Sequence, residues 1–524
     1  PTVRVTMHSA RNLDDVTGPS GPEDPELSMI AFETLDGVPI AVLANFSMHY
    51  FGDSPISADY FGLFCDGLEK HLGDRTKTQV GESHRIVGVL SHGCSGDIWR
   101  RDYANWGGKD PATIESYTQG LLKIATKLYD SIDFQRGGGI AMAEKRIPLR
   151  YRVPDSQRLQ WAQQVVDGFS EGVPTNQTEV YATEQIFLHQ MQQTEVVVQA
   201  MRIGDLAIAT TPNETYALTG LKLKHRSPLE RTMVIELANG ADGYIPPPEQ
   251  HHLGGYNTWA ARSAGLEVMA EPKIAATALA LLESVTGMSR KRFEQSVGPA
   301  AQSVIDQEPI VYWRLDEMEA SSAADASGNH HEGIFEQGVT FFLEGPQDAG
   351  HVDETQTNRC VHFAGGRLRG RLESLGDSYT VVMSIWNGMP DDVRETTGWV
   401  FSRDHDHALS QSGDHLGIGG SATEPGRIIF QNGDAAPLVG KTRIPRWSWT
   451  NVMLVRDGQA VRVYLNGNAE PEIESVGEAA STAETLFVGG RSDHDSGFEG
   501  RIDEVAIFDR ALAPGDIGGS TSAK

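Results

Sequence analysis

Apolar residues recur at three- and four-residue spacing in three segments of the first half of the chain. The longest segment covers residues 114–132, and Asp110 and Pro111 stand before it as an N-cap and a proline at the first helical position. The same spacing covers residues 60–72 and 272–282. This periodicity predicts three amphipathic helices.

Short apolar runs between these helices predict β-strands. The runs are residues 39–46, 85–90, 196–203, 206–210 and 232–237. Gly204 and Asp205 are expected to turn a hairpin between the third and the fourth run. Because strands alternate with helices, we expect a mixed α/β domain with helices packed on its sheet, over residues 1–290.

The pattern changes after residue 290, where helical periodicity stops and β-like runs separated by Gly, Asn and Asp take over. The clearest runs are residues 311–315, 379–386, 447–456, 461–465, 486–489 and 502–508. So many short strands predict an all-β jelly-roll sandwich over residues 303–517. Residues 291–302 are then a linker, and residues 518–524 a flexible tail.

Three sequence blocks of this second domain resemble the laminin-G-like, concanavalin A-type jelly roll. They are residues 313–316 with 325–329, residues 461–467 and residues 500–508. The resemblance implies either glycan binding, in some modules with calcium, or architectural packing on a neighbouring enzyme. Trp386 or Trp399 could stack on a sugar or belong to the core, and no calcium ligand is assigned.

Charge and composition exclude several classes of protein. The 44 Lys and Arg residues stand against 71 Asp and Glu residues, which gives a net charge of −27 and argues against nucleic acid or an anionic lipid surface as the partner. No run of about 18 apolar residues predicts a transmembrane segment. Three cysteines are too few for a disulfide framework.

Candidate catalytic residues follow two of the predicted strands. His49 lies just beyond residues 39–46, where an imidazole would face a cleft, although a lone histidine is more often structural. His92, Cys94 and Asp97 lie in the glycine-containing loop after residues 85–90. We expect Asp97 to organise that loop through backbone N–H groups, and no base that would activate Cys94 as a nucleophile can be placed.

Two further segments carry candidate ligands. Glu214 opens a short helix after residues 206–210, where a carboxylate suits either the helix dipole or a metal ion. Residues 239–259 mix glycine, proline and aromatic residues, including Tyr256, and are expected to form a long functional loop.

Taken in order, these four blocks resemble the neutral/alkaline ceramidases, and especially their bacterial branch, over residues 1–287. The resemblance implies zinc ligands at His49, Glu214 and Tyr256, a nitrogen and oxygen set that zinc accepts with one position left for water. It also implies a secreted, periplasmic or cell-surface protein.

Two departures from that family matter. A further zinc-binding histidine lies upstream of the His49 block in the family, and nothing before His49 matches it, so we expect that ligand upstream of Pro1, in the same chain or in a separate piece. A serine of the ceramidases is replaced by Trp99, followed by Arg100 and Arg101. These residues are expected to reshape the substrate pocket; the two guanidinium groups either bind an anionic group of the substrate or pair with neighbouring acids such as Asp102.

The resulting hypothesis is a zinc-dependent hydrolase of an amide bond in a lipid or amino-sugar conjugate. Tyr256 would steady the oxyanion, and His92 would pass a proton to the leaving amine. With the serine lost, zinc-activated water is the expected nucleophile. The alternative is a non-catalytic glycan-binding or cell-envelope structural protein that keeps the hydrolase fold.

Overall fold

The computed structural model describes residues 16–80, 84–101, 112–169, 172–319, 321–347, 350–373 and 375–517. These residues fall into two compact units. The first is Glu23–Phe293, and the second joins residues 16–22 to the chain from Glu294 onward. Residues 16–22 therefore cluster with the second unit, whereas the sequence pattern assigned them to the first domain.

The first unit is mixed α/β, as predicted. Its three-stranded sheet contains β1 (Ser28–Glu33), β2 (Pro39–Phe46) and β3 (Val87–His92). A four-stranded sheet contains β4 (Ile140–Arg150), β5 (Gln193–Ile203), β6 (Leu206–Thr210) and β8 (Arg231–Ile235). A two-residue ladder joins β7 (Glu214–Thr215) to β9 (Tyr244–Ile245). The helices are α1 (Asp59–Val80), α2 (Ile114–Asp130), α3 (Ser156–Asp167), α4 (Gln177–Met191), α5 (Ala217–Arg226), α6 (Gln250–Leu253), the 3-10 helix η2 (Tyr256–Thr258) and α7 (Ala270–Thr286).

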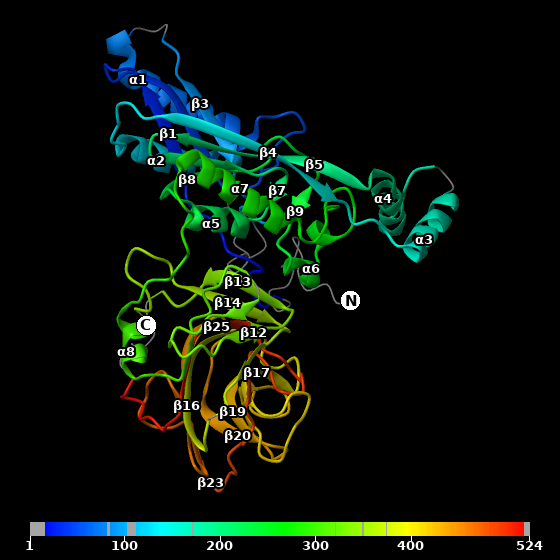
Figure 1. Cartoon of the computed structure of the whole chain (residues 1–524), viewed down its shortest axis with the longest axis vertical. Coiled ribbons are helices and arrows are strands. Elements are labelled where there is room, and N and C mark those ends of the chain that lie inside the picture. The colour runs from blue at the N-terminus through cyan, green and yellow to red at the C-terminus, as the bar shows by residue number, and fades with distance from the viewer. Residues whose placement is uncertain are drawn as a thin grey trace. The chain divides into compact units, whose positions relative to one another are not determined.

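Each of the two larger sheets is covered by its own helices (Figure 1). The buried faces of α1 and α2 pack on the three-stranded sheet through residues such as Phe64, Leu68 and Leu121. Helix α7 packs on β4, β5 and β6 with Ile274 and Leu282 fully buried. The predicted helices over 60–72, 114–132 and 272–282 are thus confirmed.

The start of α2 differs from the sequence prediction. Thr113 is its N-cap, and the Thr113 hydroxyl and the Ser116 side chain form a reciprocal capping box. Asp110 and Pro111, which were expected to start this helix, lie outside the described residues. The capping box satisfies two backbone N–H groups of the first turn, which places the start at Ile114.

The second unit is a two-sheet β-sandwich whose ladders between named strands are antiparallel over the described residues. One sheet contains β10 (Val311–Trp313), β13 (Val339–Glu344), β14 (Arg359–Ala364), β16 (Ser378–Asn387), β21 (Trp449–Asp457), β22 (Ala460–Leu465), β23 (Ile473–Val476) and β25 (Glu499–Phe508). The other contains β11 (Ser322–Ala323), β12 (Gly333–Phe335), β15 (Leu368–Arg371), β17 (Thr396–Arg403), β18 (Asp414–Gly419), β19 (Arg427–Asn432), β20 (Leu438–Arg443) and β24 (Thr485–Val488). All six strands predicted from the sequence of this unit are present.

The expected linker is ordered against the second unit. Helix α8 (Pro299–Asp306) begins inside the expected linker and continues past its end. The Arg314 guanidinium donates to the backbone carbonyls of Gln295 and Ser296 at 3.2 and 2.8 Å. On the first unit's side, the Arg290 guanidinium pairs with Glu283 at 2.6 Å. Rapid proteolysis between Arg290 and Gln307, which a free linker would predict, is therefore not expected.

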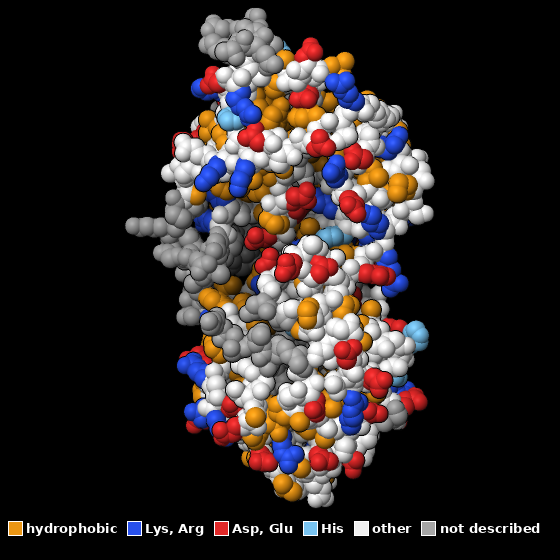
Figure 2. All heavy atoms as spheres, turned by 90° about the vertical axis from the view of Figure 1, so that its left-hand side faces the viewer, with side chains coloured by type: hydrophobic (Ala, Val, Ile, Leu, Met, Phe, Trp, Pro, Cys, Tyr) orange, Lys and Arg blue, Asp and Glu red, His pale blue; other side chains and the backbone are white. Residues whose placement is uncertain are grey.

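None of the described helices is long and apolar enough to cross a membrane. On the face drawn in Figure 2, the described acidic and basic side chains are intermixed and form no continuous basic stripe.

Candidate functional site

The candidate site of the first unit lies where parallel strands end. Strand β2 runs parallel to β3, with Phe46 opposite His92, and β6 runs parallel to β8. The N–H of Glu236, just beyond β8, donates to the carbonyl of His92 at 3.1 Å, which brings the ends of β3 and β8 together. In α/β sheets the carboxyl ends of the strands are where ligands bind.

His49 lies in the loop after β2, and the first two residues of α1 hydrogen-bond the backbone of this loop. The Tyr60 hydroxyl donates to the Met48 carbonyl at 3.0 Å, and the Asp59 carboxylate accepts the N–H groups of Phe51 and Gly52 at 2.7 and 2.9 Å. Burial lowers the pKa of the His49 imidazole, so the neutral form, which can ligate a metal, is favoured. The side chain still keeps 27% of its surface exposed.

Glu214 reaches the same place from the end of β6. Asn213 before it adopts a left-handed conformation, with φ of 63°, and its side-chain oxygen accepts the N–H of Asp242 at 2.8 Å. The N–H of Glu214 donates to the Gly243 carbonyl at 3.1 Å, in the short ladder that places Glu214 opposite Tyr244. One carboxylate oxygen, Oε2, lies 4.0 Å from His49 Nδ1.

Two tyrosines complete this cluster. The hydroxyls of Tyr244 and Tyr256 are 3.2 Å apart, and Tyr244 lies opposite Glu214 in the ladder between β7 and β9. The two rings meet edge to face at 5.5 Å. Burial raises the pKa of both phenols, so both are neutral in this arrangement.

The structure therefore brings His49, Glu214 and Tyr256 together, with Tyr244 linking the last two. The sequence analysis assigned no role to Tyr244. Its position in the glycine- and proline-containing loop of residues 239–259 was the only sign that it belongs to the site. The Oε2 atom of Glu214 is buried and accepts no hydrogen bond from any described residue. His49 offers an imidazole nitrogen, Glu214 this unpaired carboxylate oxygen and Tyr256 a phenol oxygen. Together these donor atoms suit a zinc ion.

His92, expected to shuttle a proton, lies beside this cluster. Its ring packs on Phe61 with centroids 4.4 Å apart, and its Nδ1 is 3.9 Å from Glu236 Oε1. Burial, and then the nearby charge of His49, lowers its pKa to about 4. The imidazole is therefore neutral and able to accept a proton, and its Nδ1 is buried without a hydrogen-bond partner among the described residues.

Glu236 is a buried carboxylate that the sequence interpretation missed. It accepts the Ser95 hydroxyl at 2.5 Å and the N–H of Thr215 at 2.7 Å. Burial raises its pKa well above the ordinary value. These bonds fix Thr215, the residue after Glu214, and Ser95 in the loop after His92. Glu236 therefore positions both candidate residues.

Asp97 and Cys94 have structural environments. Asp97 was expected to order its own loop, but its carboxylate accepts the N–H of Ala217, the first residue of α5, at 2.8 Å and so ties the loop to that helix. Cys94 is 1% exposed, and burial raises its pKa well above the ordinary value, so the thiol is neither accessible nor ionised as a nucleophile requires.

Trp99, Arg100 and Arg101 stack on one another next to the His49 loop. Both guanidinium groups lie over the Trp99 ring, at 4.7 and 4.4 Å from its centroid. Arg100 also lies 3.9 Å from the centroid of the Phe51 ring and donates to the Phe51 carbonyl at 2.7 Å. Arg100 is thus tied to the segment that presents His49. Asp102, the acid expected to pair with these arginines, lies outside the described residues.

A groove rich in aromatic side chains adjoins the turn that carries Tyr256. Trp259 follows η2 and meets Tyr181 of α4 edge to face, with centroids 5.2 Å apart. Trp161 and Arg158 of α3 line the same groove, and the guanidinium lies 4.5 Å from the Trp161 ring centroid. The hollow measures about 530 Å³, and its three aromatic side chains are only partly buried.

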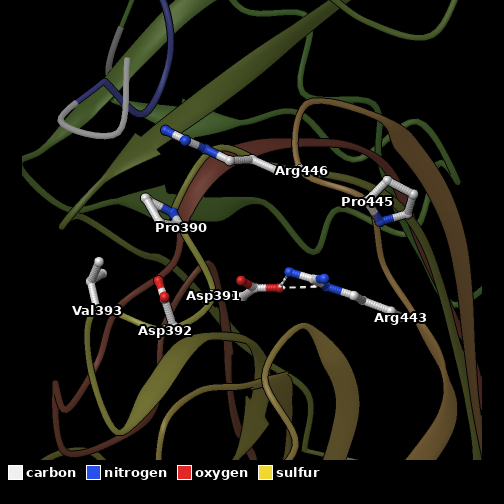
Figure 3. Close-up of a pocket in the computed structure, with 7 residues that line it drawn as sticks. All are labelled: Pro390, Asp391, Asp392, Val393, Arg443, Pro445 and Arg446. Carbon is white, nitrogen blue, oxygen red and sulfur yellow. Dashed lines mark hydrogen bonds and ion pairs between the residues drawn. The ribbon is translucent and has the colours of Figure 1, made fainter. Parts of the chain in front are cut away.

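The jelly roll contains a second hollow, of about 520 Å³ (Figure 3). It is lined by residues 390–393 with Arg443, Pro445 and Arg446, and the Asp391 carboxylate pairs with the Arg443 guanidinium at 2.6 Å. Trp399, one of the two tryptophans considered for sugar stacking, is 1% exposed and belongs to the core. Trp386 is half-buried beneath the Arg501 guanidinium, 4.7 Å from its ring centroid.

Comparison with known families identifies the C-terminal region. Residues 371–518 match the family model of the concanavalin A-like lectin/glucanases superfamily, in agreement with the two-sheet sandwich. The family model covers only this region, so the ceramidase resemblance of the first unit stays an inference from its motifs. No curated protein matches the chain.

The chain is also similar to several solved structures. Domain 4 of a GH43 extracellular arabinanase from Geobacillus stearothermophilus, solved with arabinotriose, is 18% identical, covering 40% of this chain and 96% of that one, with a TM-score of 0.30. Trypanosoma rangeli sialidase is 12% identical over 40% of this chain and 31% of its own, with a TM-score of 0.29. The receptor-binding domain of botulinum neurotoxin D is 15% identical over 41% and 52%, with a TM-score of 0.29.

Proposed function

We propose that the first unit is a zinc-dependent hydrolase that cleaves an amide bond in a lipid or amino-sugar conjugate. The observation that carries the proposal is the buried Glu214 Oε2 atom, which no described residue hydrogen-bonds and which lies 4.0 Å from His49 Nδ1. A buried carboxylate oxygen without a partner is costly. A bound cation is the partner that would remove this cost.

In this proposal His49, Glu214 and Tyr256 hold the zinc ion, which acts when bound as a Lewis acid toward the substrate carbonyl. Tyr244 connects two of these ligands, because it lies opposite Glu214 in the β7–β9 ladder and its hydroxyl is 3.2 Å from that of Tyr256. In this scheme the Tyr256 hydroxyl would donate to the carbonyl oxygen as water attacks the carbonyl carbon and negative charge develops on that oxygen. His92 would accept a proton from the attacking water and pass it to the amine that leaves when the C–N bond breaks.

The aromatic groove supplies the substrate's binding surface in this proposal. Trp259 is three residues from Tyr256, so a substrate with its carbonyl at the Tyr256 hydroxyl would extend toward Trp161 and Tyr181. Flat aromatic faces bind a sugar ring or cover an acyl chain, and Arg158 at the edge suits an anionic substituent.

The test is to measure zinc content and amide hydrolysis for the chain, Glu214→Gln and Glu230→Gln. Glu230 is a matched control, because its carboxylate is 92% exposed on the same unit. We expect hydrolysis of an N-acyl sphingosine or N-acyl glucosamine by the chain and by Glu230→Gln. Chelation or Glu214→Gln should abolish the hydrolysis, and Glu214→Gln should bind one zinc ion fewer per chain than Glu230→Gln. Hydrolysis and a zinc content that are both unchanged in Glu214→Gln would refute the assignment.

A second candidate function, which the family comparison supports better than it supports amide hydrolysis, is glycan binding by a non-catalytic protein. The match of residues 371–518 to the concanavalin A-like family supports it, and the hollow between residues 390–393 and 443–446 offers a polar and apolar surface of suitable size. An oligosaccharide array with the chain, Asp392→Ala and Arg443→Ala tests this. Binding that Glu214→Gln leaves intact, with no hydrolysis of any N-acyl substrate, would favour this function over the first.

A further inference from the structure

Two loops at one rim of the jelly roll carry histidines within reach of each other. His407 lies in the loop after β17, in the run Asp404-His405-Asp406-His407, and His494 lies in the loop before β25, in the run Asp493-His494-Asp495. The two imidazole rings are stacked, with centroids 5.1 Å apart and planes 30° apart. Ligand atoms of Asp406, His407 and His494 all lie within 4.8 Å of one another.

The backbone fixes where these two histidines leave their loops. His407 and His494 both adopt left-handed conformations, with φ of 60° and 65°, which few residues other than glycine and asparagine adopt. The N–H of His407 donates to the Ser492 carbonyl at 2.9 Å, so one loop is hydrogen-bonded to the other. The position of each imidazole relative to the other is therefore set by the fold rather than by side-chain rotation alone.

A buried arginine holds the carboxylates of the cluster. The Arg367 side chain is 2% exposed, pairs with Glu336 at 2.8 Å and with Asp406 at 3.3 Å, and donates to the Ser492 carbonyl at 3.0 Å. The Glu336 carboxylate in turn lies 4.0 Å from His494 Nδ1. Arg367 thus connects both loops to the residue after β12. The Asp406 Oδ2 atom, which also accepts from Arg369 at 3.2 Å, lies 3.8 Å from His407 Nε2.

From this arrangement we infer a divalent transition-metal site, of the kind that takes zinc, formed by His407, His494 and Asp406 with Glu336 beside it. Two imidazoles with a carboxylate select zinc, copper or nickel over calcium, which takes oxygen ligands. Ligands at about 2.0 to 2.2 Å from zinc lie at most about 4.4 Å apart. The separation of up to 4.8 Å closes by small rotations, because the imidazoles of His407 and His494 are 74% and 44% exposed.

The bound ion would link the two rim loops to each other. Residues 404–410 and 491–496 now meet through backbone hydrogen bonds and Arg367, and a shared metal adds a bond that does not depend on either. This site is independent of the one proposed in the first unit, since it uses different residues in a different unit.

The experiment is a zinc titration of the full chain by calorimetry, in the Glu214→Gln background so that the first unit's proposed site does not contribute. His407→Asn and His494→Asn are suitable variants, because asparagine tolerates the left-handed backbone and the loops should stay folded. His405→Asn is the matched control, an exposed histidine of the same loop outside the cluster. We expect one zinc ion per chain, an affinity at least tenfold weaker in either cluster variant, and no change in the control.

A second measurement separates metal binding from a folding defect. Thermal unfolding should shift upward with zinc in the background protein and in His405→Asn, and the shift should vanish in His494→Asn, while the midpoints without metal stay alike. If His407→Asn and His494→Asn both bind zinc as the control does, or if the background protein binds none, the inference is wrong.

Discussion

Two carboxylates, one in each unit, have opposite hydrogen-bonding environments. In the jelly roll, the Asp414 carboxylate is fully buried and accepts bonds from Tyr379, Arg456 and Asn432. In the first unit, Glu214 keeps one buried oxygen that no described residue hydrogen-bonds. A carboxylate whose lone pairs are all used holds a fold together, whereas one with an unused lone pair is available to a ligand.

The contrast concerns the local partners of each group rather than the unit that contains it. Glu236, 22 residues after Glu214, is also buried, but Ser95 and Thr215 satisfy it, and so it supports the site without facing a ligand. Within the jelly roll, Glu504 is satisfied by Tyr312 and Arg314 in the same way. Neither burial nor a missing partner marks the candidate site by itself, because Asp503 Oδ1 and Glu317 Oε2 of the jelly roll also lack a hydrogen-bond partner. What distinguishes Glu214 is the imidazole of His49, 4.0 Å from its Oε2 atom.

The largest effect is expected when a satisfied pair is broken. Arg456→Met leaves the Asp414 charge buried with no cation, which should lower the free energy of unfolding of the jelly roll by about 3–5 kcal/mol. Chemical denaturation, with hydrogen exchange of β16 and β21 as the local measurement, checks this. Arg462→Met is the control: its pair with Glu474 at 2.9 Å is exposed, so the loss should stay below about 1 kcal/mol. Equal losses in both variants would contradict the contrast.

Glu214→Gln should show the reverse pattern, a loss of ligand affinity with no loss of stability. Removing the charge of a carboxylate that lacks a partner costs the metal-free fold nothing, but it should weaken zinc binding by at least about 100-fold. Equilibrium unfolding in chelator and zinc titration measure the two effects. Asp414→Asn is the matched variant and should lose stability while it keeps its zinc affinity. If Glu214→Gln unfolds as readily as Asp414→Asn, then Glu214 is a structural residue.

A buried histidine should make the jelly roll sensitive to acid. Burial lowers the pKa of His415 to about 4, although the nearby Asp404 opposes this shift in part. The unfolded chain, with a pKa of about 6.5, binds more protons between these values, so stability should fall as pH drops from about 6.5 to 4, by up to about 1.4 kcal/mol per pH unit. His415→Asn should flatten this dependence, and His330→Asn, an exposed histidine, should not. Denaturation midpoints at pH 7, 5.5 and 4.5 test it; parallel curves for all three proteins would exclude His415 as the cause.

The sequence predicted elements where one residue pattern sufficed. Strand β16 is rich in β-branched and aromatic residues, β25 ends in the apolar run Val505–Phe508, and α2 carries a regular apolar stripe, so each was found. Strand β4 was missed, because Glu144, Lys145 and Arg146 interrupt its alternation and most of its side chains are exposed. Helices α3 and α4 were missed as well, since their glutamine-rich sequences bury few residues.

The candidate site was only partly predictable for a different reason. His49 and Glu214 follow apolar strands and could be identified as candidates one by one, with Tyr256 added by resemblance. The link between them could not, because Tyr244 reaches Glu214 through a two-residue ladder that exists only after β6 and β8 are paired. Glu236 was missed in the same way: its partners, Ser95 and Thr215, come from other strand ends.

The smallest effect is expected from a variant that separates substrate binding in the aromatic groove from zinc binding at Glu214. Trp161→Ala removes one aromatic face of the groove and touches none of the proposed zinc ligands, so KM for an N-acyl substrate should rise by about 3- to 10-fold with kcat and zinc content unchanged. Gln160→Ala, an exposed neighbour on α3, is the control and should change neither constant. Steady-state kinetics with two substrate series, one that varies the acyl length and one that varies the sugar, then show which part of the substrate the Trp161 ring contacts. In Trp161→Ala, KM should stop depending on the part that the ring contacts and should still depend on the other part. A fall in kcat with an unchanged KM would place Trp161 outside the binding surface and leave the groove without a role in substrate recognition.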